Sequence, residues 1–499
     1  MRNLIGKPWL SVVIFSIYPI LMLINENIDI VIPKNAIFPL FLSVFFSFFI
    51  YLTLSFITKN QIKSSLFVVI SLLFFYYYGF IYYSFFNGLI INEMTIGRHR
   101  YFLPIWSSAF VVFTILLIKV KKPLGHIIKF LNYIFSLLVI FILISIFISI
   151  YSFFTSSSSQ NINDLTFEKN VPVIKNKPDI YYIILDGYAS QNTLKNFYNY
   201  DNSKFYESLI DEGFYIANNS TSNYSNTLLS LSSSLNMSYL NMSDNYQYER
   251  QMSKRITDNK VAKLLIDKGY KYVTFESGYS VNNGSYIADL NVSCSSISEF
   301  DYLLIHSSFL SPFSRFAFVR DRILCQFDTL KKVASNESEF IFAHIISPHP
   351  PFVFDRNGDS VMMSTGSGSW SDQDGYVKQL QFINLKILEV IDQIKLNHNK
   401  DDFIMIIQSD HGPASLGNDE MSNPSDDLIK ERMGILNAYY VPNDVESRLY
   451  KDITPVNTFR VLLSELFNID LPVLDDKNYF SPLAQEKTIF TDVTEILRH

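Results

Sequence analysis

The sequence predicts an α/β protein in which an N-terminal transmembrane helical bundle precedes a mostly parallel sheet sandwiched by helices. The chain has 499 residues, enough for two or three domains. Before about residue 155, five hydrophobic runs each approach the roughly 20 residues that cross a hydrocarbon core. From Pro178 onward, short apolar strands alternate with amphipathic helices, which is typical of a parallel sheet covered on both faces. We therefore expect a five-helix membrane anchor (1–154), a linker (155–177) and a folded domain (178–499).

The membrane anchor is predicted from hydropathy alone. The first run is the shortest and is interrupted by Pro19, so a cleaved signal peptide is the alternative there. No small-residue cleavage site follows it, because the next residues are Asn25, Glu26 and Asn27, and we favour a span. The five runs are Trp9–Ile24, Ile37–Ile57, Leu66–Phe86, Tyr101–Ile118 and Phe130–Phe154.

Basic residues in the loops predict the orientation of the bundle. Lysines gather before the first run, between the second and third, and between the fourth and fifth. The loops rich in Lys and Arg stay in the cytoplasm, so the N-terminus is predicted to be cytoplasmic. Five crossings then leave the chain after Phe154 on the other face of the cell membrane. The deciding residues are Arg2, Lys7, Lys59, Lys63, Lys119, Lys121, Lys122 and Lys129.

Charge and cysteine content exclude some classes of function. The formal net charge of -6 offers no basic footprint for nucleic acid. The two cysteines, Cys294 and Cys325, form neither a C-x-x-C pair nor a Cys/His cluster, which argues against a structural zinc site. Outside the cytoplasm they could form a disulfide, and two unpaired buried thiols are the alternative.

The second half reads as strands and helices in alternation. The predicted strands are Ile180–Leu185, Phe214–Ala217, Tyr270–Phe275, Phe340–Ile346, Phe403–Gln408 and Ile435–Tyr440. The predicted helices are Ser203–Glu212, Leu228–Leu235, Val261–Asp267, Tyr376–Ile394 and Val456–Phe467. Sheets of this kind bind ligands beyond the carboxyl ends of their strands.

Polar residues at these strand ends are the candidates for chemistry. Asp186 follows one strand, Asp410 and His411 follow another, and Thr227 stands at a probable helix start between them. Carboxylates, an imidazole and a hydroxyl suit a divalent cation, which would lower the pKa of the Thr227 hydroxyl. The helix start adds a site for an anion. Taken singly, Asp186 could be a turn residue, Thr227 a helix cap and Asp410 a capping loop residue.

In their order along the chain, these residues resemble the alkaline phosphatase/sulfatase superfamily. The resemblance covers about residues 178–470. It rests on Asp186 after a strand, Thr227 at a helix start, His349 between prolines, and Ser409-Asp410-His411-Gly412 after a strand. The sequence is most similar to the membrane-anchored branch of lipoteichoic acid synthases and phosphoethanolamine or phosphoglycerol transferases. The resemblance implies an alkaline-phosphatase-like catalytic domain outside the cytoplasm.

The same resemblance implies a role for each residue. Asp186, Asp410 and His411 would bind one divalent metal ion, Mn or Zn above all, with Mg also possible. Thr227 would be the nucleophile and a metal ligand, and His349 would face the transferred phosphate or the leaving group. Asp186 replaces the Glu of several transferases. For substrate contacts the sequence offers Trp370 and Arg315 as candidates.

Two neighbouring chemistries find little support. Around Thr227 there is no Cys, Pro or Arg of the motif that becomes formylglycine, which argues against true sulfatase activity. A second metal would need more ligands. His344 and Asp355 are available, but the spacing matches nothing specific, and His344 is interpreted as a satisfied core histidine.

The sequence thus predicts a transferase at the outer face of the membrane. It would move the phospho-head group of a phospholipid, phosphoglycerol or phosphoethanolamine, onto a surface glycan or lipid through a phosphothreonine at Thr227. Two alternatives remain open. Water as the acceptor would make the protein a phosphodiesterase or phosphatase, and a non-catalytic scaffold for surface-polysaccharide assembly would bind no metal.

Overall fold

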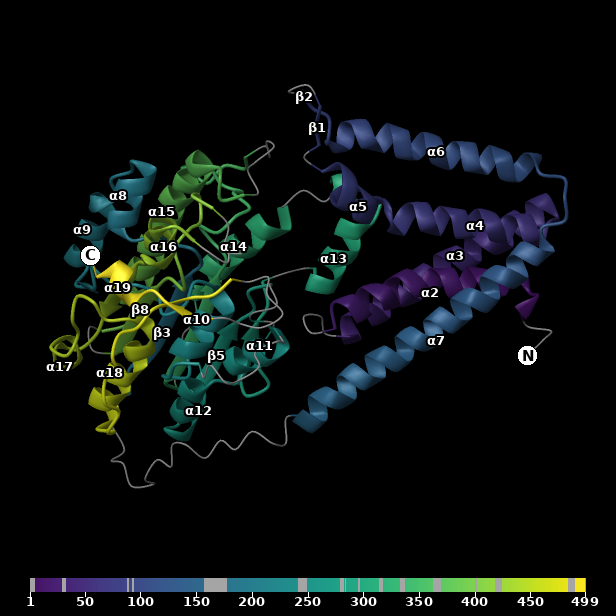
Figure 1. Cartoon of the computed structure of the whole chain (residues 1–499). Coiled ribbons are helices and arrows are strands. Elements are labelled where there is room, and N and C mark those ends of the chain that lie inside the picture. Colours follow the sequence, from purple (N-terminus) through teal and green to yellow (C-terminus); the bar gives the residue numbers. More distant parts are fainter. Residues whose placement is uncertain are drawn as a thin grey trace. The chain divides into compact units, whose positions relative to one another are not determined.

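The computed structural model divides the chain into two compact units. One unit comprises Met1–Thr166 and Ile297–Arg315, and the other comprises Phe167–Ser296 and Phe316–His499. We call the first the membrane unit and the second, which contains the candidate residues Asp186, Thr227, Asp410 and His411, the catalytic unit (Figure 1). The structure describes residues 5–28, 33–87, 89–91, 94–156, 177–240, 249–278, 282, 284–294, 297–313, 317–332, 337–361, 369–399, 402–417, 424–482 and 490–498. The linker residues 157–176 and the candidate Arg315 lie outside them.

The membrane unit contains the predicted apolar helices. Four are long and apolar enough to cross a membrane, and a fifth span is reached if α4 with the helices after it counts as one. That pair is bent by 48° at Tyr77. The helices are α2 (Pro8–Glu26), α3 (Ile37–Thr58), α4 (Gln61–Tyr76), α5 (Tyr78–Ile81), α6 (His99–Lys119) and α7 (Gly125–Ser156), with the short elements η1 (Pro33–Ala36), η2 (Tyr82–Phe86), β1 (Ile90–Ile91) and β2 (Met94–Thr95).

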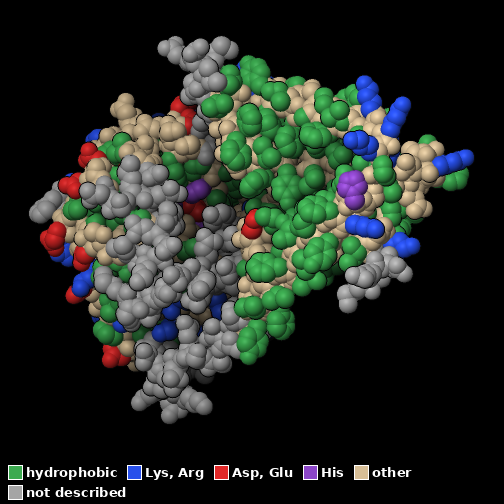
Figure 2. All heavy atoms as spheres, turned by 45° about the vertical axis from the view of Figure 1, so that its right-hand side comes forward, with side chains coloured by type: hydrophobic (Ala, Val, Ile, Leu, Met, Phe, Trp, Pro, Cys, Tyr) green, Lys and Arg blue, Asp and Glu red, His purple; other side chains and the backbone are tan. Residues whose placement is uncertain are grey.

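Helix α2 is more buried than α3, α6 and α7, and it packs against α3, α4 and α7. Of its most apolar window 39% is buried, against 6% to 17% for α3, α6 and α7. Buried hydroxyls join the helices, as in the chain from Tyr76 to Ser43 (2.8 Å) to the carbonyl of Ser16 (2.7 Å). The outer surface is covered by hydrophobic side chains, which Figure 2 shows as a broad apolar face. This is how a bundle in contact with lipid is built.

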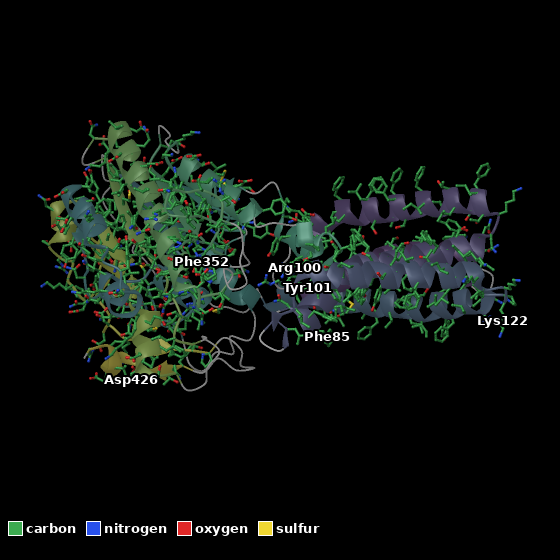
Figure 3. All side chains as sticks on the ribbon, turned by 90° about the horizontal axis from the view of Figure 1, so that it is seen from above. Phe85, Arg100, Tyr101, Lys122, Phe352 and Asp426 are labelled. Atoms are coloured by element: carbon green, nitrogen blue, oxygen red, sulfur yellow. A yellow bond between two sulfur atoms is a disulfide. The ribbon has the colours of Figure 1, made fainter. Side chains whose placement is uncertain are left out.

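The two ends of the bundle differ in charge, as the loop pattern predicts. Lys122 lies at one end, whereas Phe85, Arg100 and Tyr101 lie at the opposite end (Figure 3). Blue side chains of Lys and Arg also cluster at one end of the apolar face in Figure 2. The concentration of lysines supports the predicted cytoplasmic side.

The catalytic unit is built on a seven-stranded mixed sheet. Its strand order is β4-β9-β8-β3-β7-β5-β6. The five strands β8, β3, β7, β5 and β6 are parallel to one another. Strand β9 pairs antiparallel with β8, and β4 pairs antiparallel with β9. The strands are β3 (Asp179–Leu185), β4 (Tyr215–Ile216), β5 (Lys271–Phe275), β6 (Leu290–Val292), β7 (Glu339–Ile345), β8 (Phe403–Gln408) and β9 (Asn437–Tyr440). The predicted mostly parallel sheet is confirmed.

Helices cover both faces of this sheet. Tyr181 and Ile183 of β3 point into one core, which α15 (Gln373–Asn397) covers, while Ile180 and Tyr182 point into the other. Such two-sided burial explains why the central strands read as continuous apolar runs. The remaining elements of this unit are α8 (Gln191–Tyr198), α9 (Ser203–Asp211), α10 (Thr227–Ser234), α11 (Glu249–Thr257), α12 (Lys260–Asp267), α14 (Ala317–Leu330), α16 (Asp426–Met433), α17 (Asn443–Glu446), α18 (Pro455–Phe467), α19 (Thr494–Leu497), β10 (Tyr479–Phe480) and β11 (Thr491–Asp492).

Cys294 and Cys325 form a disulfide within the catalytic unit. Of the two alternatives left open by the sequence, the structure therefore has the bonded one. The two cysteines are separated by 31 positions in the sequence. The chain between them includes α13 (Glu299–Ser307) and η3 (Ser311–Phe313), which belong to the membrane unit. This return of the chain to the membrane unit was not predicted from the sequence.

Candidate active site

Three adjacent strands deliver the predicted residues to one edge of the sheet. Strand β3 lies between β7 and β8, and all three run parallel. Asp186 directly follows β3, and Asp410 and His411 come two and three residues after β8. His349 follows β7, and its backbone N–H donates to the Asp186 carbonyl at 3.0 Å. Because parallel strands end at the same edge, residues far apart in sequence meet there.

Thr227 reaches the same point from the first position of α10. The capping role belongs to Asn226, whose side chain accepts from the backbone N–H of Leu229 at 3.1 Å. The neighbouring hydroxyls are bonded elsewhere. Ser225 donates to the carbonyl of Ser481, and Thr221 accepts from Asn478. The Thr227 hydroxyl instead lies 3.0 Å from Nε2 of His411.

Each of the two carboxylates is only half satisfied. Oδ2 of Asp186 lies 3.1 Å from Nε2 of His344, and Oδ1 of Asp410 accepts from the backbone N–H of Gly187 at 3.2 Å. The other oxygen of each, Oδ1 of Asp186 and Oδ2 of Asp410, is buried and has no hydrogen-bond partner among the residues that the structure describes. A buried, unpartnered carboxylate oxygen is costly unless a cation compensates it.

These two oxygens converge on His411. Nε2 of His411 lies 3.6 Å from Oδ1 of Asp186 and 3.3 Å from Oδ2 of Asp410, besides the 3.0 Å to Thr227. Tetrahedral ligands that are each about 2.0–2.1 Å from one zinc ion lie about 3.3–3.4 Å apart. The three distances from Nε2 of His411 are compatible with one divalent cation shared by these atoms.

The protonation states agree with this fit. Burial lowers the pKa of His411, and the positive charge of Arg432 lowers it further, so the ring is neutral at neutral pH. Its Nδ1 lies 2.9 Å from the Gly412 carbonyl and so carries the hydrogen, which leaves the lone pair on Nε2. Burial raises the pKa of Asp186, but charge from His349 and the hydrogen bond to His344 outweigh it and hold this pKa below its usual range.

His344 lies closer to the site than its sequence context suggested. It is buried on β7, as a core histidine should be, but its Nε2 contacts Asp186, and within the described part of the chain its Nδ1 has no hydrogen-bond partner. Ligand atoms of Asp186, His344 and Asp410 all lie within 4.8 Å of one another. We favour His411 over His344 as the metal ligand, because the Nε2 of His344 is already engaged by Asp186. His344 then holds that carboxylate in place.

His349 and Trp370 lie beside the cluster. The ring centroid of His349 is 6.4 Å from that of His411 and 4.8 Å from that of Trp370. Trp370 packs over Gly187, where a Cβ would come within 2.5 Å of the indole and where φ is +72°. Glycine is thus required directly after Asp186. Asp355, considered for a second metal, instead closes a turn by accepting from Asn357 and Asp359.

Arg432 was not predicted as a site residue. Its guanidinium is buried, with Nη2 at 3.3 Å from Nε2 of His411 and 5.8 Å between its Cζ and the Trp370 ring centroid. Nε and Nη1 donate to the carbonyls of Ser225 and Gly412. Arg432 sits inside α16, where no pattern distinguishes it from a surface arginine. It adds a fixed positive charge next to the His411 nitrogen.

Comparison with known proteins now decides the family. The model of the family described as Sulfatase matches residues 178–457, which is more than half of the chain. The chain belongs to the sulfatase family. The resemblance inferred from Asp186, Thr227 and the Asp410-His411-Gly412 motif is confirmed. No curated protein matches the chain in sequence.

Several solved structures are distantly similar to this sulfatase-family chain. The C-terminal periplasmic domain of EcEptC from Escherichia coli, in complex with Zn, is 11% identical, with coverage of 64% of this chain and 94% of that one and a TM-score of 0.44. The integral membrane phosphoethanolamine transferase EptA from Neisseria meningitidis is 15% identical, with coverage of 92% and 95% and a TM-score of 0.41. Phosphonate monoester hydrolase of Agrobacterium radiobacter is 10% identical, with coverage of 62% and 82% and a TM-score of 0.42.

Proposed function

We propose that this protein is a metal-dependent transferase that moves a phospholipid-derived phospho-head group onto a surface glycan or lipid. The head group is phosphoglycerol or phosphoethanolamine, and Thr227 carries it as a phosphothreonine between the two half-reactions. The observation that carries the proposal is the 3.0 Å approach of the Thr227 hydroxyl to His411, beside two unpartnered carboxylate oxygens.

Asp186, Asp410, His411 and Thr227 would hold the metal ion. A zinc or manganese ion bound there would lower the pKa of the Thr227 hydroxyl and offset the negative charge of the phosphate. The Thr227 hydroxyl is not used for capping, because Asn226 caps α10, and it would therefore be available for attack. The start of the helix also favours an anion at this position.

In the first half-reaction, the Thr227 hydroxyl loses its proton, its oxygen forms a bond to phosphorus, and the bond from phosphorus to the diacylglycerol oxygen breaks. The diacylglycerol oxygen takes up one proton, which we assign to His349, and the proton released by Thr227 replaces it, so the half-reaction is balanced. Nδ1 of His349 lies 2.6 Å from the Pro350 carbonyl, so it carries a hydrogen and leaves Nε2 available for proton transfer. Arg432 places positive charge where the phosphate oxygens gain negative charge.

In the second half-reaction, an acceptor hydroxyl attacks phosphorus and the bond to Thr227 breaks. The acceptor loses its proton and Thr227 regains one. Overall, the phospho-head group moves from the lipid to the acceptor, and a proton moves from the acceptor to diacylglycerol. No head group is lost to water. Active sites that favour transfer over hydrolysis do so by excluding water.

The membrane unit bears on the choice of donor. The charge asymmetry of the bundle and the Cys294–Cys325 disulfide both support a catalytic unit outside the cytoplasm. Nucleotide phosphate donors are scarce there, whereas phospholipid head groups are abundant. These observations support a phospholipid as the donor for an enzyme anchored in the bilayer.

The decisive experiment is to trap the phosphothreonine. The purified full-length protein, loaded with Mn or Zn, is incubated with phosphatidylglycerol or phosphatidylethanolamine vesicles without an acceptor, then quenched in acid and digested. We expect a peptide containing Thr227 that carries the phospho-head group, together with an equimolar amount of diacylglycerol.

Thr227→Ala should abolish both products, and Thr227→Ser should retain them. Thr221→Ala is the matched control, since that hydroxyl is bonded to Asn478 away from the site. If Thr227→Ala still releases diacylglycerol, Thr227 is not the nucleophile. If free phospho-head group accumulates whatever acceptor is supplied, the enzyme is a hydrolase.

A further inference from the structure

A short stretch between two catalytic elements packs into the membrane unit. Residues 297–313, which we call the docking arm, follow β6 and precede α14 in the sequence but group with the helical bundle. Phe300 of the arm is completely buried in a cluster with Ile14, Ile20 and Tyr76. Its neighbours Leu303 and Leu304 pack against the same cluster.

The arm also completes the backbone at the bend of the membrane helix. Helix α4 ends at Tyr76, and the Phe75 carbonyl there accepts from the backbone N–H of Phe309 at 2.6 Å. A carbonyl released by a helix break needs a partner when it lies within a membrane protein. The arm supplies this partner from more than 200 residues away in the sequence.

Close packing next to the bend shows that the fit is specific. The ring of His306 stacks on that of Tyr83, with 4.0 Å between centroids, and Ser311 donates to the Tyr83 hydroxyl at 3.3 Å. Gly79 lies against the arm so tightly that a Cβ would come within 1.9 Å of the His306 carbonyl oxygen. A side chain at position 79 and the docked arm cannot coexist.

The base of the arm is closed by a covalent bond. Cys294 lies three residues before Ile297, and Cys325 lies in α14, next to Ile323 and Phe327, which pack in the core of the catalytic unit. The disulfide therefore joins both ends of the excursion to the folded sheet domain. Three residues of extended chain span at most about 11 Å, so Ile297 stays near Cys294. The 21-residue step from Ser156 to Lys177 could extend about 70 Å.

We propose that the docking arm is a second attachment between the catalytic unit and the membrane unit, fixed at its base by the Cys294–Cys325 disulfide. Its partner is the surface formed by α2, α5 and the bend after α4. The linker is the first covalent connection between the two units, and the arm would limit how far the catalytic unit can move from the bundle. If the proposed lipid transfer is correct, the arm keeps the site within reach of the bilayer.

The experiment cleaves the linker and measures whether the docking arm alone keeps the catalytic fragment bound to the membrane unit. A protease recognition sequence is inserted within residues 157–176 of the full-length protein, membranes are treated with the protease, and the catalytic fragment is measured in pellet and supernatant. We expect the fragment to stay in the pellet after cleavage. Phe300→Asp and Gly79→Leu should each release it. Leu310→Asp, at an exposed position of the same arm, should not.

A cross-link tests the same contact without destabilising it. Tyr83→Cys with His306→Cys places two thiols where the rings now stack, and the native cysteines are already bonded. After linker cleavage, the two fragments should run as one band without reductant and as two with it. Release of the unmodified fragment on cleavage, or absence of the cross-link, would overturn the proposal.

The activity readout separates this inference from the proposed function. Phe300→Asp should lose turnover of vesicle lipid and keep hydrolysis of a soluble diester such as bis(p-nitrophenyl) phosphate, which also shows that the catalytic unit is folded. Retention of the cleaved fragment does not depend on any activity. If the fragment is retained but the unmodified protein turns over no lipid, the second attachment is supported and the proposed lipid donor is wrong.

Discussion

Nε2 of His344 lies 3.1 Å from Oδ2 of Asp186, inside the core and one carboxylate oxygen away from the candidate metal position. A second His–Asp pair with the same distance occurs at the start of β3, the strand that Asp186 directly follows. There, Nε2 of His398 lies 3.1 Å from Oδ2 of Asp179, the first residue of β3. The two pairs allow a matched comparison between a histidine at the site and one far from it.

We expect His344→Gln to weaken metal binding by about 10- to 100-fold, the usual effect of removing a residue that orients a ligand. Titration calorimetry of the metal-free protein with Mn or Zn measures this. His398→Gln removes the same interaction from Asp179 and should leave metal affinity unchanged. Equal affinities for both variants would mean that His344 is an ordinary core residue.

Metal content distinguishes an enzyme from a non-catalytic scaffold. We expect the purified protein to hold about one equivalent of Mn or Zn, and Asp410→Asn to lose it, because Oδ2 of Asp410 is one of the two unpartnered oxygens. Elemental analysis of dialysed protein is the measurement. Asp355→Asn is the control, because that side chain only closes a turn. Unmodified protein that binds no metal would favour the scaffold.

Arg432 should contribute to catalysis through its charge and its shape. Arg432→Lys keeps the charge but loses the fork that spans Ser225, Gly412 and His411, so we expect kcat/KM for the lipid donor to fall about 100- to 1,000-fold. Arg460→Lys is the control, since Arg460 also donates to two carbonyls, those of Pro472 and Met237. A similar loss in both variants would point to folding rather than catalysis.

The disulfide should stabilise the catalytic unit. Closure of a loop of 31 residues is worth about 3.5–4 kcal/mol in the unfolded-chain model, so Cys294→Ser with Cys325→Ser should lower the free energy of unfolding by up to that amount. Urea unfolding of the purified protein, with thiol counting under denaturing conditions, checks this. Two reactive thiols in the unmodified protein, and no change in midpoint on substitution, would contradict it.

Strand ends and helix starts explain what could be predicted from the sequence. The site residues Asp186, Asp410 and His411 stand where apolar runs stop, and the topology of a parallel sheet brings such positions together. The strand Phe403–Gln408 was predicted with its observed bounds, and α18 differs by one residue from Val456–Phe467. Thr227 could be distinguished from its neighbours only when Asn226 was seen to cap the helix.

The rest depended on contacts that leave no local pattern. His344 alternates with apolar residues on β7, so its sequence neighbours say nothing of Asp186 across the sheet. Arg432 lies in α16, and its neighbours in sequence give no indication of its contact with His411. No helix or strand was predicted over the docking arm, because the residues that bury Phe300 belong to helices of the N-terminal bundle.

The burial of the docking arm has a practical consequence for producing the catalytic unit by itself. A fragment that begins near residue 177 would carry Phe300, Leu303 and Leu304 without the helices that cover them. Such a fragment would expose these hydrophobic side chains on a disulfide-closed loop. It would therefore bind detergent or lipid, or self-associate. Trimming residues 297–313 to a short polar turn, with Cys294 and Cys325 kept, should yield a freely soluble catalytic unit.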